Sequence, residues 1–159
     1  MKRLSTANLL LYGFLGLPLG MVALPIYVYL PQFYAERAGM SLGAIGAALL
    51  TARIAAAFID PLLGWWIGHQ GRAYPRYVWL SLPPLLAGFA GLFHPPRLAP
   101  GATLAWFGAT LMLVYLGFGL ATIAHQSWGA ALTQAPGQRS RVTAVREGCG
   151  LFGVVLAGR

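Results

Sequence analysis

The sequence predicts an all-α protein whose helices cross a membrane several times. Of its 159 residues, 58% are hydrophobic and only 9% are charged, whereas soluble domains carry about 25% charged residues. The apolar residues gather in runs long enough to cross a bilayer, since about 20 of them span a core of roughly 30 Å. These runs are too long for strands, so the predicted fold is a polytopic transmembrane helix bundle.

Five apolar spans follow one another, at residues 8–30, 42–68, 77–93, 102–128 and 142–158. The first span contains Pro18 and Pro25, which we expect to kink it because proline removes a helical hydrogen bond. A secretory signal would also follow a basic start, but its apolar core is shorter than this run. Pro83 and Pro84 interrupt the third span, and the segment 31–41 is a predicted loop.

The basic residues lie mostly in the short gaps between spans, and cytoplasmic loops are where lysine and arginine collect. One side of the membrane receives seven of them: Lys2, Arg3, Arg72, Arg76, Arg139, Arg141 and Arg146. The other side receives Arg37 and Arg97. We therefore expect a protein integral to the plasma membrane with a cytoplasmic N-terminus, and the positive charge requires no nucleic-acid partner.

The sequence contains no motif of an enzyme or of a metal site. It has no CxxC, no HExxH, no P-loop and no GxGxxG that opens a βαβ unit. The histidines His69, His94 and His125 lie on separate segments, and Cys149 is the single cysteine. The sequence therefore predicts no catalysis, no bound metal and no resident cofactor.

Two charged residues, Arg53 and Asp60, lie inside the second span. A charge within a membrane helix costs at least about 2.5–3.5 kcal/mol, so it faces a partner or a water-filled cavity and marks function. The spacing of the two residues places them on one helical face, roughly 10 Å apart. Pro61 interrupts the hydrogen-bond ladder directly beside Asp60.

Two motifs resemble those of one transporter family. The stretch Thr51–Trp65 reads T-A-R-I-x-x-x-x-x-D-P-L-L-G-W, and Arg139–Arg146 reads R-x-R-x-T-A-x-R. They are similar to the second helix, and to the run after the fourth helix, of the glycoside–pentoside–hexuronide:cation symporters, the melibiose-permease-like branch of the major facilitator superfamily. The resemblance implies the N-terminal half of a twelve-helix transporter, here four full helices and most of a fifth, with its C-terminal half missing. It also implies a solute bound near the midplane and exchanged by alternating access.

Departures from the family pattern bear on the coupling ion, which the resemblance allows to be H⁺ or Na⁺. Sugar-transporting members of the family carry acidic residues at three positions where this chain has Gly20, Ala56 and Gly68. Of the family's acids in these helices, Asp60 is the one that remains. Hard cations take several oxygen ligands, so these losses favour a proton over sodium. Asp60 and His125 are the candidates for a proton step, since histidine has an unperturbed pKa of about 6.5.

The end of the fourth span turns polar and offers a candidate solute site. Thr122, His125 and Gln126 share one helical face. Trp128 could stack on a sugar ring. The alternative is that these side chains form hydrogen bonds between helices, with Trp128 in an interfacial aromatic belt.

Arg53 and Asp60 each have two interpretations. Arg53 binds an anionic group of the solute, or it pairs with an acid on a missing helix. Asp60 takes part in coupling, or it forms a conformational latch with basic groups of the loops, a pair that breaks and reforms between two states. The candidate latch partners are Arg72, Arg76, Arg139 and Arg141.

The predicted function is secondary active transport of a sugar or a related small organic solute together with a cation. Two alternatives remain open. One is transport of lipid-like or amphipathic solutes on the same fold, and the other is a non-transporting assembly subunit of the membrane.

Overall fold

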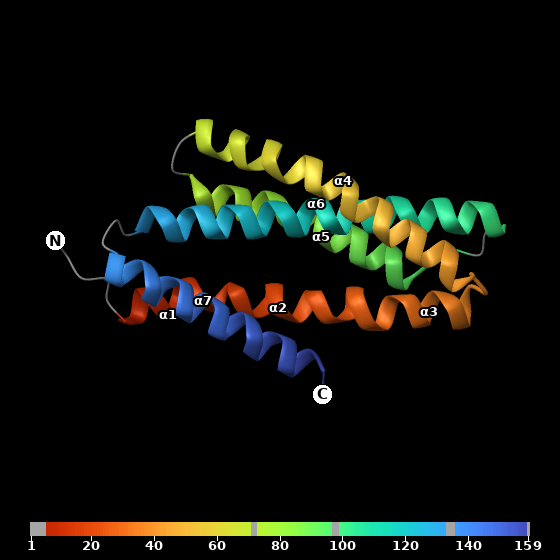
Figure 1. The fold of residues 1–159 in the computed structure, drawn as a ribbon, viewed down its shortest axis with the longest axis horizontal. Coiled ribbons are helices and arrows are strands. Elements are labelled where there is room, and N and C mark those ends of the chain that lie inside the picture. Colours follow the sequence, from red (N-terminus) through yellow and green to blue (C-terminus); the bar gives the residue numbers. More distant parts are fainter. Residues whose placement is uncertain (1–5, 71–72, 97–98, 133–135, 159) are drawn as a thin grey trace. The chain divides into compact units, whose positions relative to one another are not determined.

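A computed structural model describes residues 6–70, 73–96, 99–132 and 136–158. Within these ranges the chain is helical and contains no strand, so the predicted all-α class is confirmed (Figure 1). The chain divides into two compact units. We call Met1–Tyr29 together with His125–Arg159 the terminal unit, and Leu30–Ala124 the central unit.

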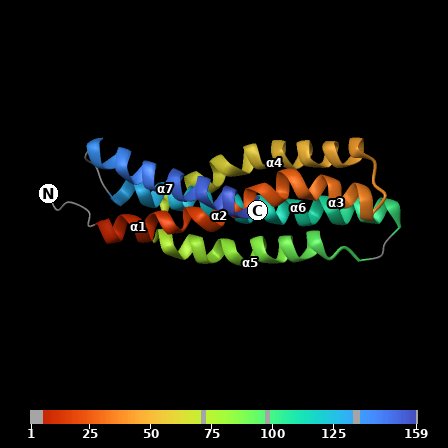
Figure 2. The same ribbon diagram turned by 90° about the horizontal axis from the view of Figure 1, so that it is seen from below.

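The terminal unit consists of short helices from the start of the chain and longer ones from its end. Its elements are α1 (Thr6–Phe14), α2 (Gly16–Leu24), a π-helical turn (Pro25–Tyr29), the last turns of α6 (Pro100–Leu132) and α7 (Pro136–Ala157). Helices α2 and α7 lie side by side in both views of the ribbon (Figures 1 and 2).

Glycines allow the backbones of α2 and α7 to touch. A Cβ atom added at Gly20 would collide with the carbonyl oxygen of Gly150, and one added at Gly153 would collide with that of Leu17. Small residues at a helix crossing are the usual means of close packing in membranes, where apolar surface alone drives no association. This contact fixes α7 against the first span.

The central unit contains α3 (Leu30–Arg37), α4 (Leu42–His69), α5 (Tyr74–Phe93) and α6 up to Ala124. Ser41 caps α4, because its Oγ accepts a hydrogen bond from the backbone N–H of Ala44 at 3.2 Å. Helices α5 and α6 approach so closely that a Cβ at Gly117 would lie 2.7 Å from the backbone nitrogen of Leu85.

The expected interruption of the third span is wrong, because α5 runs unbroken through Pro83 and Pro84. Pro61 likewise lies inside the continuous helix α4. Each proline removes a single backbone donor, and the hydrogen bonds on either side of it keep the long helix intact. Pro18, by contrast, falls in the first turn of α2, and Pro25 opens the π turn, so both coincide with interruptions of the first span.

The expected loop at residues 31–41 is also wrong for its first part, because α3 continues the helix to Arg37. The preceding π turn shifts the hydrogen-bond ladder by one residue, so the missing N–H of Pro31 falls where the regular ladder is already disturbed. The other helices begin or end a few residues outside their expected bounds. In particular, α7 starts at Pro136, since proline suits the first helical position.

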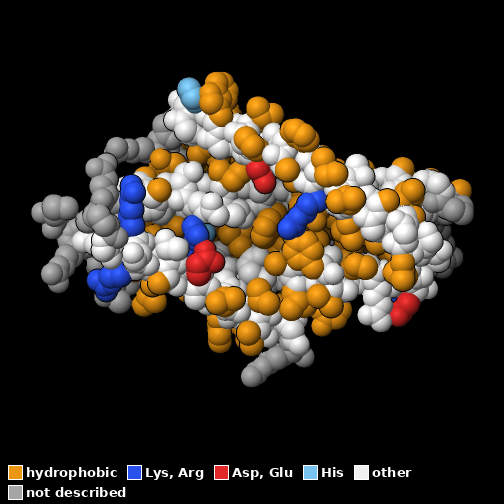
Figure 3. Space-filling model, viewed as in Figure 1, with side chains coloured by type: hydrophobic (Ala, Val, Ile, Leu, Met, Phe, Trp, Pro, Cys, Tyr) orange, Lys and Arg blue, Asp and Glu red, His pale blue; other side chains and the backbone are white. Residues whose placement is uncertain are grey.

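Three helical segments of the described chain are long and apolar enough to cross a membrane: Leu9–Arg37, Leu42–His69 and Gly101–Leu132. Large apolar side chains on α4 are exposed at Leu50, Ile54, Phe58, Leu62 and Trp65. Hydrophobic side chains cover much of the surface in Figure 3, with few charged ones between them. A surface of this kind belongs in lipid or against further helices, so the chain is an integral membrane protein.

Candidate functional site

A pair of reciprocal hydrogen bonds joins Tyr12 of α1 to His125 of α6. The Tyr12 hydroxyl donates to the backbone carbonyl oxygen of His125 at 2.9 Å, and Nε2 of His125 lies 2.9 Å from the carbonyl oxygen of Tyr12. The two rings also pack together, with centroids 4.3 Å apart. Both side chains are buried, at 3% and 2% exposure. We call this arrangement the Tyr12–His125 pair.

Neighbouring residues of α6 shape the space around Tyr12. A Cβ at Gly129 would collide with the Tyr12 hydroxyl, so only glycine admits the ring at this position. Trp128 packs edge-on against Tyr12, with ring centroids 5.8 Å apart. Together with Leu9, Val142 and Leu132, these aromatic residues form an apolar cluster at one end of the terminal unit.

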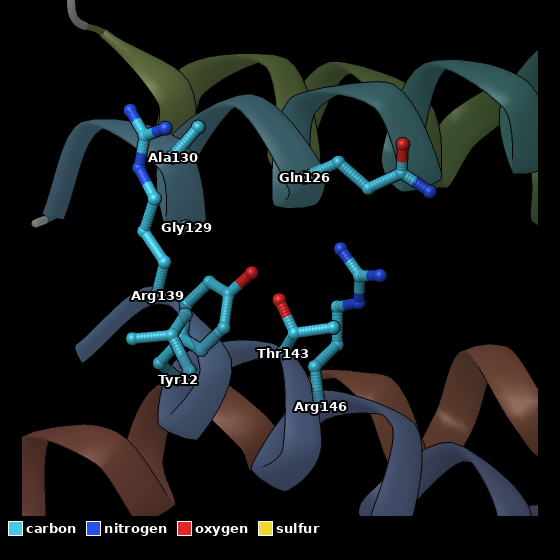
Figure 4. A pocket seen from close by; sticks show the side chains of 8 residues that line it. Tyr12, Gln126, Gly129, Ala130, Arg139, Thr143 and Arg146 are labelled. Atoms are coloured by element: carbon cyan, nitrogen blue, oxygen red, sulfur yellow. The ribbon is translucent and has the colours of Figure 1, made fainter. Parts of the chain in front are cut away.

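Next to this cluster the terminal unit contains a half-open cavity of about 200 Å³, which we call the terminal cavity. Its lining comes from α1, α6 and α7 (Figure 4) and consists of Tyr12, Gln126, Gly129, Ala130, Arg139, Val142, Thr143 and Arg146. In Figure 4 the side chains of Gln126, Thr143 and Arg146 point into the space between α6 and α7.

Helical spacing explains why these residues meet. On α7, Arg139, Val142 or Thr143, and Arg146 recur at intervals of three or four residues, which places them on one face. Gln126 and Ala130 share a face of α6 in the same way. The face of α7 thus supplies charged and hydroxyl groups, and the face of α6 supplies an amide and small residues.

Arg146 forms two interactions at the edge of the cavity. Its guanidinium forms an ion pair with Glu147, whose side chain is 61% exposed, and it also interacts with the Tyr12 hydroxyl. Arg146 itself retains 21% side-chain exposure. The cavity therefore presents the guanidinium, hydroxyl and amide groups that form hydrogen bonds with a hydroxyl-rich solute.

Asp60 occupies a separate crevice within the central unit. The crevice is lined by Ala56, Ile59, Asp60, Met112, Tyr115 and Leu116 and has no room for a water molecule. A Cβ at Gly119 would lie 2.5 Å from Oδ1 of Asp60, so the carboxylate fits closely against the backbone of α6. No group of three His, Cys, Asp or Glu side chains that could hold a metal lies among the described residues.

The structure separates the predicted solute-binding residues. Of the four on α6, Gln126 lines the terminal cavity, whereas His125 and Trp128 pack behind its wall. Thr122 belongs to the central unit, and its buried Oγ1 has no hydrogen-bond partner in the described part of the chain. Arg53 lies exposed on α4.

The candidate latch partners of Asp60 lie in different parts of the chain. Arg72 lies outside the described residues. Arg76 is exposed at the start of α5 and forms no ion pair with Asp60 within the ranges that the structure describes. Arg139 and Arg141 belong to the terminal unit, so their pairing with Asp60 stays a prediction.

Of the residues that line the cavity, only Gln126 was a predicted solute-binding residue, and Arg139 was predicted as a latch partner. Three polar residues of the lining were in neither group: Tyr12, Thr143 and Arg146. The motif Arg139–Arg146 contained a signal for two of them, because its polar residues repeat at helical spacing. Tyr12 carried no such signal, since its partner His125 lies 113 residues away.

Residues 11–158 of the chain match the family described as "MFS/sugar transport protein". The chain is 29% identical, over 136 residues, to the isoprimeverose transporter of Lactiplantibacillus pentosus. The aligned region covers 82% of this chain and 28% of that protein. It is 26% identical, over 152 residues, to the uncharacterized symporter YjmB of Bacillus subtilis, covering 92% of this chain and 33% of that protein. No solved structure matches the chain.

Proposed function

Because the chain belongs to the MFS/sugar transport protein family, we propose that it forms part of a secondary active transporter for a sugar or a related small organic solute. Members of this family move solutes and are not enzymes. The profile match confirms the resemblance drawn from Thr51–Trp65 and Arg139–Arg146. The sugar-related name of the isoprimeverose transporter favours sugars over lipid-like solutes.

The terminal cavity is the observation that carries this proposal. Its volume of about 200 Å³ falls below the roughly 300–1,000 Å³ of sites for drug-sized ligands, and so suits one small solute. Tyr12 contributes an aromatic face, while Gln126, Thr143 and Arg146 contribute hydrogen-bonding groups. Apolar surface combined with a few directed polar groups is the composition expected of a small-molecule site.

We propose that solute movement is coupled to a proton and that Asp60 takes part in the coupling. Asp60 is the single carboxylate among the residues lining its crevice, and α6 packs closely over it. One carboxylate offers too few oxygen ligands for a hard cation. Arg53 lies on the same helix and is proposed to bind an anionic group or to pair with an acid of a further helix.

The chain spans about a third or less of the length of the curated relatives it matches, namely 33% and 28%. We propose that further helices complete the transport unit, as the two-halved plan of such transporters requires. We also propose that the protein lies in the plasma membrane with its N-terminus in the cytoplasm, because seven basic residues then lie on the cytoplasmic side.

The test is uptake of labelled sugars by proteoliposomes that hold the complete transporter, with and without a proton gradient. Arg146→Gln removes a guanidinium from the cavity and should raise the KM for the transported sugar about tenfold or more, as expected when a charged hydrogen-bond donor is lost. Arg37→Gln is the matched control, because Arg37 lies at the end of α3 against Phe33. Absence of uptake of every sugar, or equal effects of the two variants, would contradict the proposal.

A further inference from the structure

His125 was expected to bind solute or to carry a proton, yet it lines no part of the terminal cavity. Its side chain is 2% exposed. A backbone carbonyl can only accept a hydrogen bond, so Nε2 of His125 carries the hydrogen that points to the Tyr12 carbonyl at 2.9 Å. Tyr12, which packs against His125, lines the cavity instead.

The bond from His125 reaches the backbone of α1 close to its end. Helix α1 ends at Phe14, and the carbonyl of Tyr12 lies two residues before that end. His125 donates to this carbonyl from α6 and thereby ties the end of α1 to α6.

Tyr12 transmits this constraint to the cavity. Its ring packs against that of His125 at an interplanar angle of 47°, and its hydroxyl donates back to the His125 carbonyl. The hydroxyl also lies against Gly129, where a Cβ would collide with it. The same hydroxyl interacts with Arg146. A displacement of Tyr12 would therefore move both the wall of the cavity and the surroundings of its guanidinium.

We propose that His125 is a positioning residue, which holds Tyr12 in the wall of the terminal cavity and so sets the affinity for the solute, without carrying the coupled proton. The inference rests on the proposed solute site in the same cavity. The charged and titratable groups that face His125 are Tyr12 on α1 and Arg146 and Glu147 on α7. The ring nitrogen Nε2 of His125 is bonded to the backbone carbonyl of Tyr12, so this nitrogen faces the backbone and not a proton relay.

The test compares two substitutions of His125 in the complete transporter. His125→Leu removes the donor, and we expect the KM for sugar to rise about tenfold, the equivalent of one buried hydrogen bond, while the maximal rate stays within about twofold. His125→Gln keeps an amide N–H that reaches the Tyr12 carbonyl but has no titratable nitrogen. We expect it to restore the KM to within about threefold and to keep proton-driven accumulation.

Matched substitutions of His69 serve as controls, since His69 is exposed and its Nδ1 bonds only to Trp65 of its own helix. Loss of proton-driven accumulation in His125→Gln, with KM unchanged in His125→Leu, would assign the proton step to His125 and overturn the proposal. The same substitutions at His69 should change neither quantity.

A second readout does not depend on solute transport. Thermal unfolding of Tyr12→Phe, His125→Leu and the double variant forms a double-mutant cycle. The two substitutions remove different side-chain-to-backbone hydrogen bonds, but each bond helps to hold the ring that makes the other. We therefore expect the double variant to lower the unfolding midpoint by less than the sum of the two single shifts. If the two midpoint shifts simply add, the Tyr12–His125 pair is overturned. If the shifts do not add but no sugar is taken up, the proposed function is refuted and the pair stands.

Discussion

Substitution of Gly153 by alanine tests the contact that fixes α7 in the terminal unit. A Cβ at this position would collide with the carbonyl oxygen of Leu17 and would lie 3.0 Å from its carbonyl carbon and 3.1 Å from the backbone nitrogen of Met21. Each of these contacts is to backbone, which cannot rotate away. The two helices must therefore separate.

The expected size of the effect is the difference between two opposing terms. Overpacking of this kind costs about 1–3 kcal/mol, and alanine recovers about 1 kcal/mol over glycine in a helix. If α2 and α7 move apart by about 0.5–1 Å, the dispersion attraction between their surfaces also falls by a quarter to a half. We expect a net loss of about 1 kcal/mol, which lowers the unfolding midpoint by about 2–4 °C.

Cys149, the single cysteine, is partly buried on α7 and provides the assay. Its reaction with a thiol-specific fluorescent dye on heating reports unfolding of the chain in detergent. Gly148→Ala is the control on the same helix, because nothing lies within 4 Å of a Cβ there. The control should be stabilised by up to about 1 kcal/mol. Equal midpoints for the two variants would refute the close packing of α2 against α7.

Three further predictions follow from other parts of the chain. Asp60→Asn should lower proton-driven accumulation at least about tenfold without loss of membrane insertion, measured by uptake and by the amount of protein in the membrane; normal accumulation would exclude Asp60 from coupling. Gly119→Ala places a Cβ 2.5 Å from Oδ1 of Asp60 and should turn the carboxylate away, whereas Gly108→Ala opens onto empty space. Only the first should lower proton-driven accumulation, and equal accumulation by the two variants would contradict the role of the crevice. The proposed orientation is tested by thiol labelling in a cysteine-free background. Glu36→Cys should react with a membrane-impermeant reagent added to intact cells, and Arg76→Cys should react only after permeabilisation. The opposite pattern would show that the orientation is reversed.

The helices could be predicted from the sequence because long apolar runs have few alternatives in a membrane. Their interruptions could be predicted only in part. Pro61, Pro83 and Pro84 share the chemistry of Pro25, yet only Pro25 coincides with an irregular turn. The local penalty of a proline is similar at each position, so the proline alone does not decide the outcome.

The candidate site was predictable only in part. Gln126 and Arg139 were singled out from the sequence, and both line the terminal cavity. Helical spacing shows which residues share a face, but it does not show which other helix that face meets. Tyr12 and Arg146 meet because α1, α6 and α7 pack together, and only the folded chain brings them to one place.

The most direct test of the account asks whether a sugar occupies the terminal cavity. Thr143→Cys, made in a Cys149→Ser background of the complete transporter, places a thiol in the lining, and Arg37→Cys places one outside it. The account predicts that the transported sugar slows thiol labelling at position 143, in proportion to its occupancy, and leaves labelling at position 37 unchanged. Equal labelling rates at position 143 with and without saturating sugar, in a protein that transports that sugar, would contradict the placement of the solute in this cavity.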